Sequence, residues 1–249
     1  NKQIAKYQSL LLKMTSDAIK ETLPSYLIEN KKLLPLRNAL KMIHFPDNQV
    51  SLNLAVFRIK FEELLYLQLS LLRQKNLRER FTTGFMMPRV GKYFNACFQN
   101  IPFELTNAQK RVIKEIRSDL VSGKQMNRLL QGDVGSGKTM VAVLCALLAA
   151  DNGFQSCIMA PTEVLANQHY KSALKIVEGS GIEIALLTGS TKSYERNKIL
   201  EGLSQGKIHI LFGTHALIED RVKFNNLGFA VIDEQHRFGV EQRARLWTK

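Results

Sequence analysis

The chain has 249 residues, of which 45% are hydrophobic and 23% are charged. These fractions are close to globular averages, which excludes a wholly disordered chain and a collagen-like repeat. Lys and Arg outnumber Asp and Glu by 35 to 22, and the net charge of +13 favours a polyanionic partner such as nucleic acid. The longest strongly apolar run, residues 141–150, is about half of the ~20 residues that span a membrane, so we predict no transmembrane segment.

The positive charge is concentrated in the first part of the chain. Residues 1–100 hold 16 basic and 7 acidic side chains, whereas residues 101–249 hold 19 and 15. A basic surface also serves solubility or attraction to an anionic membrane. Charge alone therefore leaves these alternatives to nucleic-acid binding open.

The cysteines and the ends of the chain give further expectations. Three scattered cysteines fit neither a disulfide framework nor a zinc site and indicate a reducing cytoplasm; they are Cys97, Cys145 and Cys157. The chain begins at Asn1 without a signal-peptide pattern and ends at Lys249 without a tail. We therefore expect a segment of a longer cytoplasmic protein.

Residues 1–100 are predicted to be mostly helical. Apolar residues recur on one face over residues 4–23, and Pro24 ends that helix. A second helix is predicted over residues 35–44, ending before Pro46. A third, rich in Leu, is predicted over residues 61–75.

From about residue 101, short apolar runs alternate with helical segments. Helices are predicted over residues 107–121, capped by Thr106 or Asn107, and over residues 140–150. The candidate strands are residues 128–131, 156–160, 184–187, 208–212 and 229–232. This alternation predicts an α/β fold with a parallel sheet covered by helices on both faces.

A glycine-rich loop is the most specific motif, because it matches GxxxxGK[ST] between an apolar run and a helix. Its residues are Gly132, Asp133, Val134, Gly135, Ser136, Gly137, Lys138 and Thr139. Glycines let backbone N–H groups converge on phosphate oxygens at the positive end of a helix. Lys138 can reach the β- and γ-phosphates and the Thr139 hydroxyl can bind Mg²⁺, so the loop predicts a nucleoside triphosphate with Mg²⁺. The alternative is a glycine-rich turn that happens to carry a lysine.

A pair of carboxylates ends the last predicted strand. Asp233 at the strand tip can hold Mg²⁺, and Glu234 can orient and deprotonate an attacking water. Both lie where ligands bind in open α/β sheets, at the carboxyl ends of the strands. Alone, the pair could be a solvated surface feature and His236 an ordinary loop histidine. With the phosphate loop, they predict a hydrolysis site in which His236 couples nucleotide state to a second site.

The order of these motifs resembles that of superfamily-two helicases and translocases of the DExH type, with the box reading Asp-Glu-Gln-His at residues 233–236. The run over residues 233–243 closely resembles the RecG family of bacterial DNA helicases and the transcription-repair coupling translocases. Residues 23–24, 43–46 and 61–64 resemble the helical linker that precedes the motor in the RecG family, which favours that family.

The resemblance implies a domain organisation. Residues 101–249 would form the N-terminal RecA-like ATP-binding domain, truncated after the acidic box. Residues 1–100 would form the linker between wedge and motor domains. The wedge domain and the second motor domain with its arginine fingers are expected outside this chain. The sheet is then expected to lack a strand, and the isolated chain to bind ATP weakly and hydrolyse almost none.

The resemblance also assigns binding residues. It implies that Gln109 hydrogen-bonds adenine and that Phe103 packs on the base, although Gln109 could otherwise be a surface residue. It further implies that three turns hold DNA phosphates without reading sequence. Their residues are Pro161, Thr162, Gly189, Thr214 and His215. An ordinary turn, with a threonine as helix cap, is the alternative for each.

The implied function is that of a bacterial, nucleoid-associated, ATP-dependent DNA helicase that remodels replication forks and Holliday junctions in recombination and repair. A transcription-repair coupling translocase is one alternative. Another P-loop enzyme, such as a small-molecule kinase, is a second. In a third, residues 1–100 act as a basic DNA-binding or docking module and not as a structural spacer.

Overall fold

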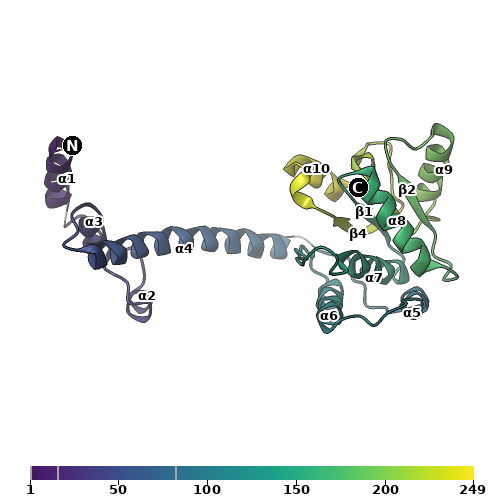
Figure 1. The fold of residues 1–249 in the computed structure, drawn as a ribbon, viewed down its shortest axis with the longest axis horizontal. Helices are drawn as coiled ribbons and strands as arrows, with labels where there is room; N and C mark the ends of the chain where they lie inside the picture. The colour runs from purple at the N-terminus through teal and green to yellow at the C-terminus, as the bar shows by residue number, and fades with distance from the viewer. Residues whose placement is uncertain (1, 16, 82) are drawn as a thin grey trace. The chain divides into compact units, whose positions relative to one another are not determined.

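A computed structural model describes residues 2–15, 17–81 and 83–249 of the chain (Figure 1). The contacts between residues divide the chain into two compact units, residues 1–81 and residues 82–249. The first unit is helical, and the second contains the sheet. Residues 83–100 therefore belong to the unit with the sheet, although the sequence pattern changes only near residue 101.

The first unit contains four helices within its described residues. They are α1 (Lys2–Thr15), α2 (Ser25–Asn30), α3 (Leu36–His44) and α4 (Gln49–Phe81). The helix predicted over residues 35–44 is confirmed as α3. The Leu-rich helix is longer than predicted and begins at Gln49, not at residue 61. The helix predicted over residues 4–23 is confirmed as far as Thr15 and is wrong over residues 17–23.

A buried arginine binds Glu21, which lies in the part of the predicted helix that does not form. Arg58 on α4 is fully buried, and it donates through Nε to the Leu34 carbonyl at 3.0 Å and through Nη2 to Glu21 at 2.6 Å. Its Nη1 donates to Glu62, one turn along α4. The Glu21 carboxylate also accepts the backbone N–H of Leu36 at 2.8 Å. Glu21 meets these partners only outside a helix, and such charged hydrogen bonds outweigh helix propensity.

The second unit alternates helices and strands. Its first helices are α5 (Lys92–Gln99), α6 (Asn107–Val121) and α7 (Lys138–Asp151). The following elements are β1 (Gln155–Met159), α8 (Glu163–Val177), β2 (Ile184–Leu187), α9 (Ser193–Ser204), β3 (Ile210–Gly213), η1 (His215–Ile218), β4 (Leu227–Ile232), η2 (Gln235–Arg237), α10 (Val240–Ala244) and η3 (Arg245–Thr248). Four predicted strands and the helices α6 and α7 are confirmed, with small shifts at their ends.

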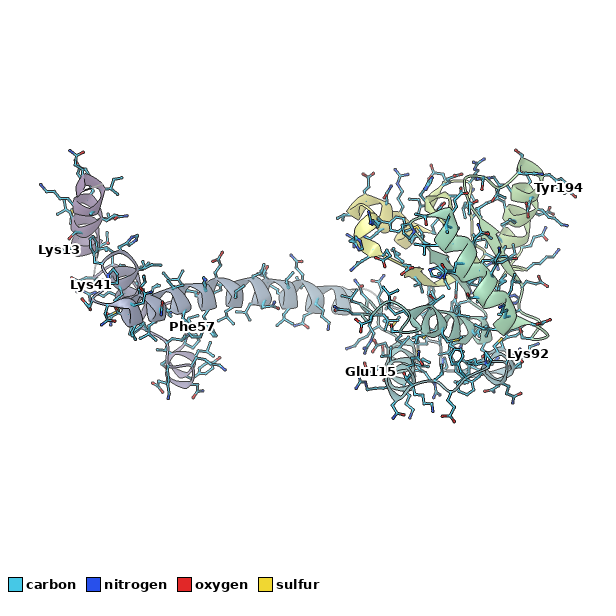
Figure 2. All side chains as sticks on the ribbon, viewed as in Figure 1. Lys13, Lys41, Phe57, Lys92, Glu115 and Tyr194 are labelled. Atoms are coloured by element: carbon cyan, nitrogen blue, oxygen red, sulfur yellow. The ribbon has the colours of Figure 1, made fainter. Side chains whose placement is uncertain are left out.

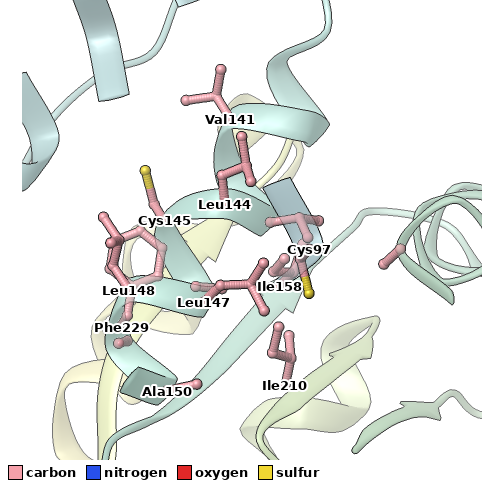
Figure 3. Close-up of a cluster of buried hydrophobic side chains, with 14 of the residues drawn as sticks. Cys97, Val141, Leu144, Cys145, Leu147, Leu148, Ala150, Ile158, Ile210 and Phe229 are labelled. Atoms are coloured by element: carbon pink, nitrogen blue, oxygen red, sulfur yellow. The ribbon is translucent and has the colours of Figure 1, made fainter. Parts of the chain in front are cut away.

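The sheet is parallel, and its four strands lie in the order β2-β3-β1-β4. Side chains alternate between its faces. Ile158 and Ile210 share a buried cluster with Leu144 and Leu147 of α7 on one face (Figure 3). Cys157 and Leu211 pack into the core of the other face. Burial on both faces confirms the α/β class that was predicted from the sequence.

One predicted strand is wrong. Residues 128–131 pair with no strand in the described part of the chain. Leu129 is 70% exposed, and Arg128 forms ion pairs with Glu115 and Asp119 of α6, of which Glu115 is labelled in Figure 2. A strand needs a neighbouring strand that accepts and donates its backbone hydrogen bonds. Among the described residues β4 is the last strand of the sheet, and no further strand pairs with residues 128–131. In the ranges that the structure describes the sheet therefore ends at β4, and the lack of a further strand stays a prediction.

A buried aspartate attaches the segment before α5 to the sheet unit. Asp151 ends α7, and its carboxylate accepts the backbone N–H groups of Gly91 at 2.8 Å, Tyr93 at 3.0 Å and Phe94 at 3.1 Å. A Cβ atom on Gly91 would lie 2.6 Å from the Asp151 carboxylate, so this close approach requires glycine. The interaction caps α5 and places residues 91–99 with the α/β unit.

All three cysteines are free and buried. Burial raises the pKa of the Cys145 and Cys157 thiols to about 12, so both stay protonated at neutral pH. None of the helices in the described ranges has the length and apolar character needed to cross a membrane.

Candidate functional site

The predicted site residues gather at one edge of the sheet. Residues 160–162 follow β1, residues 188–190 follow β2, residues 214–215 follow β3, and residues 233–234 follow β4. Because the strands are parallel, their carboxyl ends meet at the same edge, where open α/β sheets bind ligands. The strand order places the acidic box at one end of this row and the Gly189 turn at the other.

The phosphate loop has the conformation that its glycines predict. Gly135 has a φ of 80° and Gly137, the residue before α7, has a φ of 79°, which only glycine adopts without cost. The first N–H groups of a helix have no partner within it, so the start of α7 offers donors and a positive dipole end to an anion. Lys138 Nζ donates to the carbonyls of Gly132 and Asp133, both at 2.8 Å. A phosphate oxygen would replace these neutral acceptors with a charged one.

Gln109 connects α6 to this loop. Its Oε1 accepts the Thr106 N–H at 2.8 Å, its own N–H donates to Thr106 Oγ1 at 3.2 Å, and its Nε2 donates to the Ser136 carbonyl at 2.9 Å. A Cβ atom on Gly137 would collide with this Nε2. Gln109 is therefore bound to the loop and is not a free surface residue. Phe103 is 53% exposed, and its packing on adenine stays a prediction.

The two predicted metal ligands meet through a histidine that the sequence analysis did not single out. Thr139 Oγ1 lies 3.3 Å from His169 Nδ1, and His169 Nε2 lies 2.8 Å from Asp233 Oδ2. Asp233 is also held through its backbone, whose N–H donates to the Met159 carbonyl at 2.8 Å. In the sequence His169 stands seven residues after Thr162, which the helicase resemblance assigns to a DNA-binding turn, and this proximity is the signal that could have pointed to it.

The Asp233 carboxyl is held in its ionised form. The hydrogen bond from His169 lowers the pKa of Asp233 below its ordinary value and outweighs the opposing effect of burial. The Glu234 N–H, which donates to Oδ1 at 3.0 Å, and the charge of Lys138 also lower this pKa. An ionised carboxylate beside the phosphate loop suits a cation.

The donor set fits a Mg²⁺ ion that arrives with a nucleotide. Magnesium prefers oxygen ligands and combines one or two carboxylates with water and substrate phosphates. Thr139 and Asp233 supply such oxygens. The described residues contain no cluster of three His, Cys, Asp or Glu side chains that could hold a metal by itself. The remaining ligands would therefore come from phosphate and water.

Glu234 has an unusual backbone conformation. Its φ of 48° and ψ of 50° are left-handed, which costs a non-glycine residue about 1–2 kcal/mol, and such strained conformations cluster at active sites. Its side chain is 50% exposed, and Oε2 lies 3.5 Å from Nδ1 of His236, which is itself 66% exposed. Both side chains are thus accessible beyond the strand tip. The role of His236 in coupling stays a prediction.

Two of the predicted DNA-binding turns lie next to each other. The Thr162 hydroxyl accepts the Leu165 N–H at 3.3 Å and caps α8, as the alternative interpretation requires, but its own proton stays available as a donor. Glu163 accepts the Ser190 N–H at 3.1 Å and the Ser190 hydroxyl at 2.6 Å. This carboxylate therefore joins the Pro161–Thr162 turn to the turn that contains Gly189.

The third turn offers less to DNA. Thr214 is only 2% exposed, and its hydroxyl is buried without a partner among the described residues. His215, the next residue, is exposed at the start of η1. Of this pair, only His215 presents its side chain to solvent, and DNA contact by either residue stays a prediction.

Comparison with known proteins gives one consistent result. Residues 106–249 match the DEAD/DEAH box helicase family. Among curated relatives, the "ATP-dependent DNA helicase RecG" of Thermotoga maritima is 47% identical over 93% of this chain, and that of Bacillus subtilis is 42% identical over 100%. A solved "Structure of RecG bound to three-way DNA junction" is 44% identical and has a TM-score of 0.78 over 96% of this chain. The chain spans 30% and 36% of the two relatives and 32% of the solved chain.

Proposed function

This chain belongs to the DEAD/DEAH box helicase family and is of the RecG type, and we propose that it carries the first ATP-binding half of a helicase motor. In this proposal residues 101–249 form the N-terminal RecA-like domain, and residues 1–100 correspond to the linker between wedge and motor, of which residues 83–100 pack with the sheet unit. The observation that carries it is the meeting of Thr139 and Asp233 through His169. It joins the phosphate loop to the acidic box, although the two lie far apart in the sequence.

The nucleotide would be ATP. The loop from Gly132 to Thr139 binds the phosphates through backbone N–H groups and Lys138, and Gln109 and Phe103 hold the adenine. Thr139 and Asp233 hold Mg²⁺, which neutralises negative charge on the β- and γ-phosphates when it is bound.

Hydrolysis and DNA contact would use the same edge of the sheet. Glu234 orients the attacking water and accepts its proton, and His236 passes the change in nucleotide state to a second site. The turns at Thr162, Gly189 and His215 hold DNA phosphates. Phosphates are the same at every base pair, so these contacts bind DNA without reading its sequence. ATP turnover then moves the first motor half against the second, which lies outside this chain.

The whole protein would be an ATP-dependent helicase that remodels branched DNA in recombination and repair in the bacterial cytoplasm, associated with the nucleoid. The basic composition supports a nucleic-acid partner. RecG relatives match across the helical region as well as the motor half, which disfavours the transcription-repair coupling alternative. The solved relative with a three-way junction supports branched DNA as the substrate class.

Replacing Lys138 by Ala is expected to weaken binding of a fluorescent ATP analogue with Mg²⁺ by about 10–100-fold. Hydrogen bonds to a charged group contribute about 1.5–3 kcal/mol each, and about 1.4 kcal/mol corresponds to a tenfold change in Kd. Lys175→Ala removes an exposed lysine from the far end of α8 and serves as the matched control. Equal binding by all three proteins would mean that the loop is not assembled.

Replacing Thr162 by Asp separates helix capping from DNA binding. Asp caps a helix as well as Thr does, so α8 should remain intact. A carboxylate would repel a DNA phosphate, so affinity for a three-way junction, measured by fluorescence anisotropy at fixed salt, is expected to fall by about tenfold or more.

Ser204→Asp provides the control for charge, because Ser204 ends α9 at the opposite edge of the sheet. It is expected to change DNA affinity by less than about twofold. If Thr162→Asp also left DNA affinity unchanged, Thr162 would be a helix cap and no more.

A further inference from the structure

We propose that His169 is a positioning residue for the magnesium site, orienting the Thr139 hydroxyl and the Asp233 carboxylate toward the metal. The inference rests on the proposed function, because it takes Thr139 and Asp233 as the magnesium ligands. It adds a residue from a third segment of the chain, α8, to a site otherwise built from the phosphate loop and the acidic box.

The position of His169 is well defined by its surroundings. Its side chain is only 12% exposed. Helix α8 is anchored on the sheet unit by buried residues on either side of His169, Ala166 and Ala173. A ring held in this way contacts both ligands from one fixed position.

The two contacts of His169 determine which atom donates in each hydrogen bond. An ionised carboxylate only accepts, so the Asp233 contact at 2.8 Å requires the proton on His169 Nε2. In the neutral ring Nδ1 is then an acceptor, and the Thr139 hydroxyl, 3.3 Å away, donates to it. A hydroxyl that points its proton at the histidine leaves its oxygen lone pairs free for a cation.

The same bond restrains Asp233. Its Oδ2 accepts from His169, and its Oδ1 accepts the Glu234 N–H at 3.0 Å. Each carboxylate oxygen keeps further lone pairs in fixed directions. Groups that hydrogen-bond to metal ligands in this way orient them, and their loss typically costs about 10–100-fold in metal affinity.

The test measures how nucleotide binding depends on magnesium. A fluorescent, non-hydrolysable ATP analogue is bound to the protein while Mg²⁺ is titrated, and binding is also measured with the metal chelated. For His169→Ala, the Mg²⁺ concentration for half-maximal binding is expected to rise by about 10-fold or more, with metal-free binding changed by less than about twofold. His169→Gln, whose amide can still donate to Asp233, is expected to recover part of this loss. Ser172→Ala, which removes an exposed hydroxyl from the same helix, is the control.

The outcomes separate this inference from the function on which it rests. If the wild-type protein binds no nucleotide at any Mg²⁺ concentration, the proposed function fails. If the wild type shows Mg²⁺-dependent binding and His169→Ala matches it, the positioning role fails. An equal loss of metal-free binding would show that His169 supports the loop structure only, and a lower Mg²⁺ requirement would show that it competes with the metal. Both results overturn the proposal.

Discussion

Replacing Glu234 by Gln is expected to reduce DNA-stimulated ATP hydrolysis by about 10²–10⁴-fold, the range that a positioned general base contributes. Gln keeps the size of the side chain and its left-handed backbone position but cannot accept the proton of the attacking water. Because the phosphates are bound by other residues, binding of ATP with Mg²⁺ is expected to stay within about twofold of the wild type. Steady-state ATPase assays on the whole protein that contains this chain, together with equilibrium nucleotide binding, measure both effects.

Glu241→Gln is the matched control for this prediction. Glu241 lies on α10 close to the acidic box, its side chain is 87% exposed, and it pairs with Arg245 at 3.6 Å. The Glu241→Gln variant is expected to hydrolyse ATP at the rate of the wild type. Normal hydrolysis by Glu234→Gln would exclude Glu234 as the general base, and an equal loss in both variants would indicate a nonspecific charge effect.

Replacing Arg58 by Ala is expected to destabilise the first unit by about 3–5 kcal/mol, the usual cost of removing one partner from a buried ion pair. The variant leaves Glu21 and Glu62 without their cation and leaves the Leu34 carbonyl without its donor. Hydrogen exchange resolved by peptide measures this locally, and protection in α3 and α4 should fall while protection in α7 is unchanged.

The same unit contains a matched control. Arg37 pairs with Asp17 at 3.1 Å, but the two side chains are 54% and 97% exposed. Exposed pairs contribute about 0–1 kcal/mol, so Arg37→Ala is expected to alter protection only slightly. If the Arg58 and Arg37 variants behaved alike, burial of the Arg58 network would contribute nothing to the fold.

The pH dependence of the first unit follows from Glu21. Burial alone would raise its pKa, but hydrogen bonds from backbone N–H groups, including that of Leu36, and from Arg58 lower it below the ordinary 4.5. Because the pKa of Glu21 is lower in the folded state than in the unfolded state, its ionised carboxylate stabilises the fold at pH values above the unfolded-state pKa. This stabilisation is lost as the pH falls through the folded-state pKa. The first unit should therefore lose stability below about pH 4.5, and Arg58→Ala should reduce that loss.

Local sequence patterns were enough to predict much of the second unit. Strand β2 and helix α6 have the predicted bounds, because an apolar run between turn residues and a helix with a capping threonine are signals contained in adjacent residues. The phosphate loop is equally local, since the φ values of Gly135 and Gly137 depend on glycine at those positions. Residues 128–131 have the same apolar character as a strand, yet they form none, since strand pairing depends on a neighbour far away in the sequence.

The sequence by itself determined the fold class, the phosphate loop, the acidic box and the family resemblance, because each depends on residue types at short spacings. Only the tertiary structure decided that Glu21 binds Arg58 outside a helix, that the Asp151 carboxylate at the end of α7 binds the backbone at the start of α5, and that His169 contacts both Thr139 and Asp233. Each of these is a polar side chain that bonds a group remote in sequence. A buried or partly buried polar group must find a partner, but its own neighbours in the chain carry no information about which partner the fold brings to it.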